Sequence, residues 1–152
     1  MKITDFLDLK TIIPALAHRE KNAVLEELAN LLAAHHSELD KNKVLDVLER
    51  ERISTTAIGE GVAIPHGKLG GVERVLGAFA RSPEGVDFAS LDGGTTHLFF
   101  ALIAPENAAA DHLKALARIS RLLKDEAFRR RLMAGQSAEE LFEIIVEEDE
   151  KF

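Results

Sequence analysis

The sequence predicts an α/β protein in which a mixed β-sheet is sandwiched between helices on both faces. Three observations lead to this fold class. Apolar residues with helical spacing mark two segments before residue 52 and three segments after residue 108. The part of the chain between them contains strand-like stretches, bounded by glycine- and proline-rich turns. One of these stretches, residues 96–104, is apolar almost throughout, as expected for a central strand covered on both sides.

Length and composition limit the alternatives. The 152 residues, 46% of them hydrophobic, predict one domain over residues 1–152 with a sizeable core. No apolar run is long enough to span a bilayer and no signal peptide is evident, so we expect no membrane insertion. The absence of cysteine excludes disulfides and thiolate metal sites and fits a cytoplasmic protein. A net charge of −7 argues against nucleic-acid binding and suits either solubility or a basic partner.

In the N-terminal third, residues 3–16 predict an extended or irregular entry segment. A helix follows from Lys21 to His36, because its apolar residues recur with helical spacing. Asp40 is a suitable N-cap for a second helix, which we expect to end near Arg52.

In the C-terminal half, we expect strands at 74–81 and 96–104, a turn at 82–85 and a short edge strand at 86–88. A helix is expected over residues 109–123, and its predicted buried stripe consists of Leu113, Leu116, Ala117, Ile119, Ser120 and Leu123. Asp125 predicts the cap of a short helix that ends at Gly135. Ser137 and Glu140 form a capping-box pattern for the last helix, and the acidic tail 147–150 is expected to be solvated and frayed.

The stretch from Arg50 to Lys68 organises the chain. A glycine-punctuated loop leads into a short apolar strand, which Pro65 should end near Ile64, because proline cannot donate to a strand ladder. His66 would then be presented at the end of that strand, and Gly67 would let another molecule approach beside the imidazole. Taken alone, the pattern also fits a half-exposed loop histidine without a function.

Residues 50–67 resemble the phosphorylation-site signature of the fructose/mannitol class of enzyme IIA, the phosphocarrier domains of the bacterial phosphoenolpyruvate-dependent phosphotransferase system. The match rests on Gly59-x-Gly61 and on the sequence Ala-Ile-Pro-His-Gly at 63–67, and the continuation through Lys68 and Leu69 is most similar to the nitrogen-regulatory branch. The resemblance extends over nearly the whole chain. It implies an α/β sandwich that needs neither a cofactor nor a metal ion.

Two histidines are candidate site residues. A neutral imidazole carries a nucleophilic lone pair near pH 7, so His66 can accept a phosphoryl group, and the resemblance implies attachment through Nε2. The other ring nitrogen should be held by a hydrogen bond whose partner the sequence does not identify. His112 lies in the first turn of a predicted helix, where unpaired N–H groups and the helix dipole favour an anion. It resembles the family's second active-site histidine, although a helix-start histidine can also be simply exposed.

Arg50 is the third candidate, because a guanidinium can hold two phosphoryl oxygens and the residue matches the family's arginine. The alternative for Arg50, which we favour for Arg52, is a cation that stabilises a helix C-terminus. The hydroxyls of Thr55 and Thr56 can donate to phosphate, or to the local backbone. Lys68 either attracts an acidic partner or is solvated.

The predicted function is that of a phosphocarrier, which an HPr-like protein phosphorylates on His66, with Ile58 and Val62 as docking contacts. Three roles remain open: regulation of protein targets in nitrogen or potassium control, transfer to an enzyme IIB for fructose or mannitol uptake, and a binding module that is never phosphorylated. No Gly-x-x-x-x-Gly-Lys motif, Gly-x-Ser-x-Gly elbow or metal-ligand spacing supports another chemistry.

Overall fold

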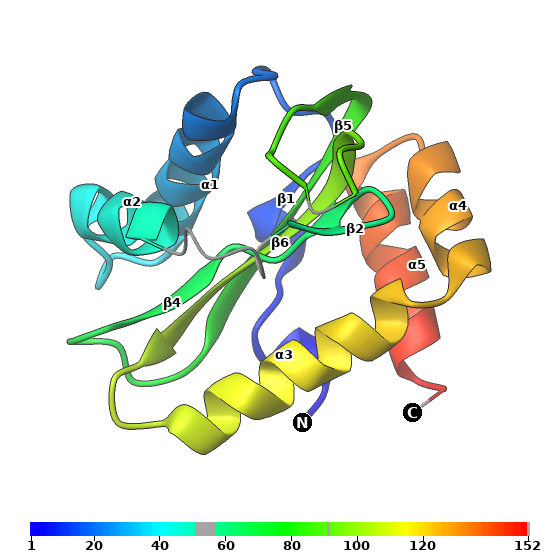
Figure 1. Ribbon diagram of the computed structural model, residues 1–152. Helices are drawn as coiled ribbons and strands as arrows, with labels where there is room; N and C mark the ends of the chain where they lie inside the picture. Colours follow the sequence, from blue (N-terminus) through cyan, green and yellow to red (C-terminus); the bar gives the residue numbers. More distant parts are fainter. Residues whose placement is uncertain (51–56, 91, 152) are drawn as a thin grey trace.

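The computed structural model describes residues 1–50, 57–90 and 92–151. Helices α1 (Lys21–His35) and α2 (Lys41–Arg50) lie on one side of a six-stranded sheet. Helices α3 (Ala109–Leu123), α4 (Glu126–Ala134) and α5 (Ala138–Asp149) lie on the other side (Figure 1). The predicted sandwich of helices around a mixed sheet is therefore confirmed. No helix within the described ranges is long and apolar enough to cross a membrane.

The sheet is built around β6 (Thr96–Pro105). Its strand order is β1-β5-β6-β3-β2, and β4 pairs with β6 beyond the end of β3. The other strands are β1 (Ile12–Ile13), β2 (Ala57–Gly59), β3 (Val62–Ala63), β4 (His66–Leu69) and β5 (Leu76–Val86). β6 runs antiparallel to β5 and parallel to both β3 and β4. This central position explains why residues 96–104 are apolar almost throughout.

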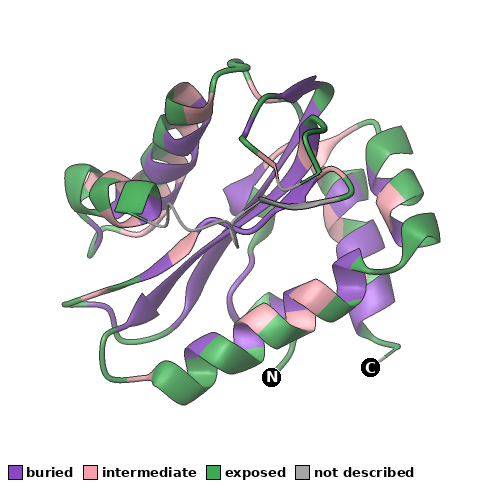
Figure 2. Cartoon of the chain, viewed as in Figure 1, coloured by how far each residue is buried: buried purple, intermediate pink, exposed green. Residues whose placement is uncertain are grey.

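Side chains of β6 alternate between two separate cores. Leu98, Phe100 and Leu102 face the helices α3, α4 and α5. Phe99, Ala101 and Ile103 face α1 and α2. Figure 2 shows the strands buried between the two helical layers, whose outer surfaces are exposed. Neither layer can be removed without exposing one side of the central strand.

Helix ends follow the predicted caps. The Asp40 carboxylate accepts the N–H groups of Asn42 and Lys43, 2.9 and 3.2 Å away, at the start of α2. Asp125 likewise caps α4, and Ser137 accepts the N–H of Glu140 at the start of α5. These side chains satisfy backbone donors that a helix leaves unpaired.

The entry segment is more regular than predicted. It forms 3₁₀ turns at Ile3–Asp5 and Leu9–Thr11 and then the short strand β1. β1 pairs in parallel with β5, Ile12 opposite Phe79 and Ile13 opposite Ala80. A two-residue strand carries no detectable alternation, which is why the sequence pattern did not reveal it.

β5 passes through the turn predicted at 82–85. Its register with β6 shifts between Arg81 and Val86, which marks an irregularity rather than a chain reversal. Gly85 adopts a φ of 93°, and its N–H donates to Ser82 Oγ at 3.0 Å. The glycine and proline therefore mark a bulge in one long strand, and the separate edge strand expected at 86–88 is wrong.

The buried stripe of α3 is displaced from the predicted one. Leu113 is 66% exposed, whereas His112, Ala115, Ile119, Leu122 and Leu123 are buried. Relative to the prediction the helix is rotated by about one residue, and the buried His112 side chain lies beside His66 of β4. An apolar residue predicted to be in the core is thus on the surface.

The acidic tail is also different from the prediction. Glu148 and Asp149 are each only 3% exposed. Asp149 accepts the N–H of Ile3 at 2.8 Å and pairs with the Arg118 guanidinium. The carboxylate joins the N-terminal segment to α3 and α5, so the end of α5 is held in place rather than frayed.

Candidate functional site

His66 begins a strand instead of ending one. β3 stops at Ala63, close to the predicted end at Ile64, because Pro65 cannot donate to the ladder. The Pro65 carbonyl still accepts the N–H of Leu102 at 3.0 Å, and pairing with β6 resumes as β4, with His66 opposite Leu102. The histidine therefore lies at a break between two short strands that share one neighbour.

Gly67 is required by packing within the chain. A Cβ atom added at Gly67 would lie 2.0 Å from Cγ1 of Val47 on α2. The predicted reason for this glycine, the approach of another molecule, is therefore wrong, because the space is filled by α2. Since side chains alternate along a strand, the His66 side chain points to the opposite face, toward α3.

The His66 ring is oriented by its own backbone. Its Nδ1 lies 2.5 Å from the carbonyl oxygen of Ile64. A carbonyl oxygen can only accept, so Nδ1 carries the hydrogen in the neutral ring and Nε2 carries the lone pair. This contact supplies the hydrogen bond that the sequence required but could not place. The ring is half-buried, so it is held firmly and is still accessible.

His112 lies beside it, in the first turn of α3. The two ring centroids are 5.4 Å apart and the ring planes meet at 66°. His112 is 7% exposed, and its Nε2 is buried without a hydrogen-bond partner among the described residues. An unsatisfied buried polar atom is costly in a folded protein and commonly marks a functional position.

Burial lowers the pKa of His112, and the neighbouring charges of His66 and Lys68 lower it further. The His112 ring is therefore neutral near pH 7, and one of its nitrogens can donate a hydrogen bond while the other accepts one.

Lys68 adds positive charge to this site. It is exposed, and it lies two residues after His66, on the same face of β4. Because side chains alternate along a strand, the spacing of His66 and Lys68 could have predicted that they share a face. The sequence alone did not decide between a partner-binding and a solvated Lys68. Together with the N-terminal end of α3, where Ala108 provides no side-chain cap, the lysine makes the surroundings of His66 favourable for an anion.

The remaining predicted site residues are not assembled in the same way. Arg50 ends α2, and its exposed guanidinium donates to Asp46 on the same helix at 2.5 Å. Its role at the site stays a prediction. Thr55 and Thr56, like Arg52, lie outside the described residues. Val62 is only 2% exposed, so the prediction that it is a docking contact is wrong. The side chain of Ile58, the other predicted docking contact, is not among those that the structure describes.

This arrangement has a definite chemical capacity. Nε2 of His66 is a nucleophile of fixed orientation, and a second neutral imidazole lies next to it. A lysine and a helix N-terminus offer positive charge to an incoming anion. The set suits reversible attachment of a phosphoryl group to an imidazole nitrogen.

Known proteins are similar to this chain in both sequence and fold. The sequence profile of one family, described as the EIIA 2 component of the phosphoenolpyruvate-dependent sugar phosphotransferase system, matches residues 5–148. A nitrogen regulatory protein of Bradyrhizobium diazoefficiens is 46% identical over 146 residues, 95% of either chain. The fructose-specific EIIABC component of Bacillus subtilis is 40% identical over 150 residues, which are 98% of this chain and 24% of that longer protein.

A solved structure agrees with these sequence relatives. The crystal structure of the nitrogen regulatory protein IIA-Ntr from Neisseria meningitidis has a TM-score of 0.87 and 37% identity to this chain. The match covers 94% of this chain and 98% of the other. The similarity therefore includes the layers that carry both histidines.

Proposed function

Because the chain belongs to the EIIA 2 family of the phosphoenolpyruvate-dependent sugar phosphotransferase system, we propose that it carries a phosphoryl group on Nε2 of His66, received from an HPr-like protein. The observation that carries this proposal is the contact of His66 Nδ1 with the Ile64 carbonyl, which leaves the nucleophilic lone pair on the other nitrogen.

In the transfer, the Nε2 lone pair of His66 forms a bond to phosphorus. The phosphorus–nitrogen bond of the donor breaks, and its electron pair returns to the donor's ring nitrogen. Positive charge then develops on the His66 ring, and the Nδ1 hydrogen bond to Ile64 strengthens as it does so. Catalysis needs little more than positioning and charge stabilisation.

Other residues would stabilise the phosphoryl oxygens. We assign His112 a hydrogen bond to one oxygen, because its ring adjoins His66 and its Nε2 has no described partner. Lys68 supplies charge from the same strand. Arg50, Thr55 and Thr56 are proposed to complete the oxygen contacts, which for Arg50 requires exchange of its bond to Asp46.

The downstream role is proposed to be regulatory. The relatives at 46% and 37% identity over nearly their full lengths are nitrogen regulatory proteins. The alternative, transfer to an enzyme IIB during sugar uptake, has support from the fructose-specific relative, of which this chain spans 24%. A module that is never phosphorylated is disfavoured by the two adjoining histidines.

The phosphoryl site is tested by incubation with phosphoenolpyruvate, enzyme I and the HPr-like carrier. We expect one acid-labile phosphoryl group on the protein, absent from His66→Ala. The control is His18→Ala, which removes an exposed histidine bound to Glu27, far along the chain from the site. Absence of an adduct on the unchanged protein, or an undiminished one on His66→Ala, would contradict the proposal.

The two downstream roles separate in a second step. Phosphorylated protein is mixed with isolated IIB domains for fructose and for mannitol, and loss of the phosphoryl group is followed. A regulatory protein should keep its phosphoryl group at a rate close to that of hydrolysis alone. Rapid transfer to either IIB domain would favour the uptake role.

A further inference from the structure

The groups around His66 that suit an anion all belong to this chain. His112 is 7% exposed, and its buried Nε2 has no hydrogen-bond partner among the described residues. Lys68 lies on the same face of β4 as His66 and brings a positive charge. The protein therefore holds groups suited to a phosphoryl group before any partner protein arrives.

The start of α3 adds backbone donors to this site. Each of the other described α-helices has a side chain that accepts an N–H of its first turn, from Glu20, Asp40, Asp125 or Ser137. The N-cap residue of α3, Ala108, provides no such side chain, and the first N–H groups of a helix have no acceptor within it. The buried Nε2 of His112, in the same turn, is independent evidence that an acceptor belongs here.

The protonation of this site restricts the leaving group of a phosphoryl donor. Burial lowers the pKa of His112, and the charges of His66 and Lys68 lower it further. The neutral ring can donate a hydrogen bond to a phosphoryl oxygen, but it is a poor general acid near pH 7. A phosphate monoester must release an alkoxide, which needs a proton from such an acid. An acyl phosphate releases a carboxylate, which leaves as an anion because the ordinary carboxyl pKa is about 4.

We propose that His66 also accepts a phosphoryl group directly from a small acyl phosphate, without a protein donor. The proposal rests on the proposed function, because it uses the same Nε2 nucleophile and the same surrounding groups. One chain contributes the oriented ring, the second imidazole, the lysine and the helix terminus. A small donor then has to bring only the activated phosphoryl group.

The direct step balances without a proton transfer. The Nε2 lone pair of His66 forms the bond to phosphorus, and the bond between phosphorus and the acyl oxygen breaks. Its electron pair leaves on the carboxylate. The ring keeps its Nδ1 hydrogen, and the positive charge that develops on it is stabilised by the Ile64 carbonyl.

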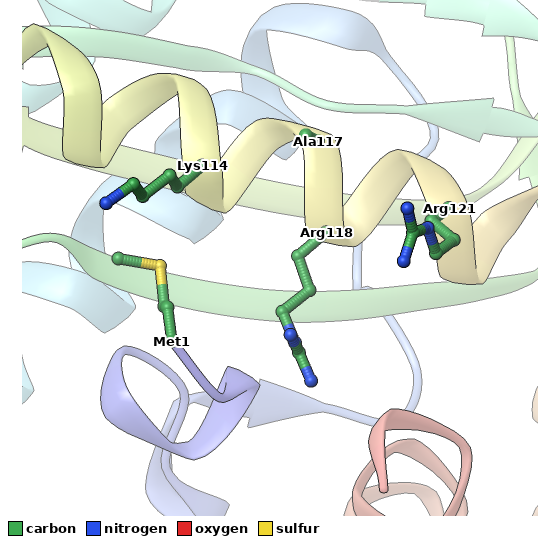
Figure 3. Close-up of a pocket in the computed structure, with 5 residues that line it drawn as sticks. All are labelled: Met1, Lys114, Ala117, Arg118 and Arg121. Atoms are coloured by element: carbon green, nitrogen blue, oxygen red, sulfur yellow. The ribbon is translucent and has the colours of Figure 1, made fainter. Parts of the chain in front are cut away.

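A second cationic surface on α3 could attract the same small anion. Beside Met1 lies a groove whose cationic lining residues extend from this helix (Figure 3): Lys114, Arg118 and Arg121. No histidine lines the groove, and Arg118 is paired with Asp149. An acyl phosphate held there meets no imidazole, so Lys114 offers a matched control position on the helix that carries His112.

Direct transfer is tested by incubation with acetyl phosphate that carries labelled phosphorus, without enzyme I or the carrier protein. The label counts phosphoryl transfer alone, because acylation of a lysine releases the phosphate. We expect one acid-labile phosphoryl group, formed at least about a hundredfold faster than on N-acetylhistidine. His66→Ala should abolish it, and His18→Ala should not. Glycerol phosphate, a monoester, should give no adduct.

Three further variants test the groups that hold the phosphoryl oxygens. His112→Ala should slow labelling by about a hundredfold and Lys68→Met by about tenfold, because each removes a stabilising group. Lys114→Met removes an equal charge from the other groove and should leave the rate unchanged. Circular dichroism and thermal unfolding establish that each variant is folded. Equal slowing by the two lysine variants would contradict the assigned site.

Other outcomes would overturn direct transfer. They are a rate no greater than that of N-acetylhistidine, an adduct that persists on His66→Ala, and no adduct in the time in which the phosphorylated carrier labels the same sample. The assay with the carrier separates the two proposals. Label from the carrier alone rejects direct transfer only, whereas label from acetyl phosphate alone rejects the protein donor and keeps His66 as the phosphoryl site.

Discussion

The imidazole of His112 meets that of His66 nearly edge-on, with 5.4 Å between the ring centroids, and its Nε2 is buried without a described partner. A polar atom in this situation destabilises the resting protein and gains a bond only when an acceptor arrives. A phosphoryl oxygen on His66 would be such an acceptor. The new hydrogen bond would then stabilise the phosphorylated protein selectively, because the unphosphorylated protein lacks it.

The first prediction concerns this pair. His112→Ala should slow phosphorylation of His66 by about a hundredfold, since one donor to the transferring oxygens is lost. His112→Gln, which keeps a donor of similar reach, should recover part of the rate. Rapid-quench measurement with the phosphorylated carrier tests both. Equal rates for His112→Ala and the unchanged protein would exclude a role for this ring.

The second prediction is a pH dependence of stability. The folded protein holds the pKa of His112 below its ordinary value of 6.5, chiefly through burial. The unfolded chain therefore binds more protons as the pH falls below about 6.5, and the free energy of unfolding decreases with it. Urea unfolding at a series of pH values should show this slope, and His112→Gln should reduce it.

His36 contributes to the same slope and must be separated from His112. Its pKa is also lowered, first by burial and then by the charge of His35. His36→Gln alone should therefore remove a different part of the slope, and the double variant should flatten it most. A slope that neither substitution changes would contradict the assignment to these two rings.

The third prediction concerns the contact behind the site. Gly67→Ala should destabilise the protein by about 1–3 kcal/mol, because the new methyl group would lie 2.0 Å from Cγ1 of Val47. Val47→Ala in the same chain removes the clashing atom and should restore part of the loss. Chemical denaturation of both single variants and the double variant measures this coupling. Additive effects would show that the two residues do not meet.

The fourth prediction concerns the end of α5. Asp149→Ala should destabilise the protein by about 3 kcal/mol, because it leaves the Arg118 guanidinium and the Ile3 N–H without their buried acceptor. Glu150→Ala, one residue later and exposed, should change stability by less than about 0.5 kcal/mol. Similar losses for the two variants would show that the tail is not anchored by Asp149.

Helix positions were readily predicted from sequence, because caps and apolar spacing are local signals. Asp40, Asp125 and Ser137 all cap helices as expected. The predicted limits of the helix at 109–123 agree with α3, but its rotation does not. Periodicity of apolar residues cannot show that a histidine faces the core, and in α3 His112 is buried where Leu113 was predicted to be.

The missed features depend on contacts distant in sequence. β4 gives no recognisable strand pattern in the sequence, since its four residues include His66, a glycine and a lysine. The tail looks solvated because four acidic residues occur together, and only Arg118 and the Ile3 N–H explain why Asp149 is buried. Family resemblance identified the two adjoining histidines as candidates. The hydrogen bond from His66 to the Ile64 carbonyl is visible only in the three-dimensional structure, because no sequence pattern predicts it.

The junction of β3 and β4 determines when the His66 ring becomes ordered. Ile64 lies between two strands fixed to the same neighbour, so its carbonyl is immobilised as the sheet forms. The imidazole bound to that carbonyl loses its rotamer freedom during folding rather than during encounter with a donor. In the proposed function, each phosphoryl exchange would thus begin from a preorganised nucleophile, and an encounter too brief to reorient a side chain would still be long enough to react.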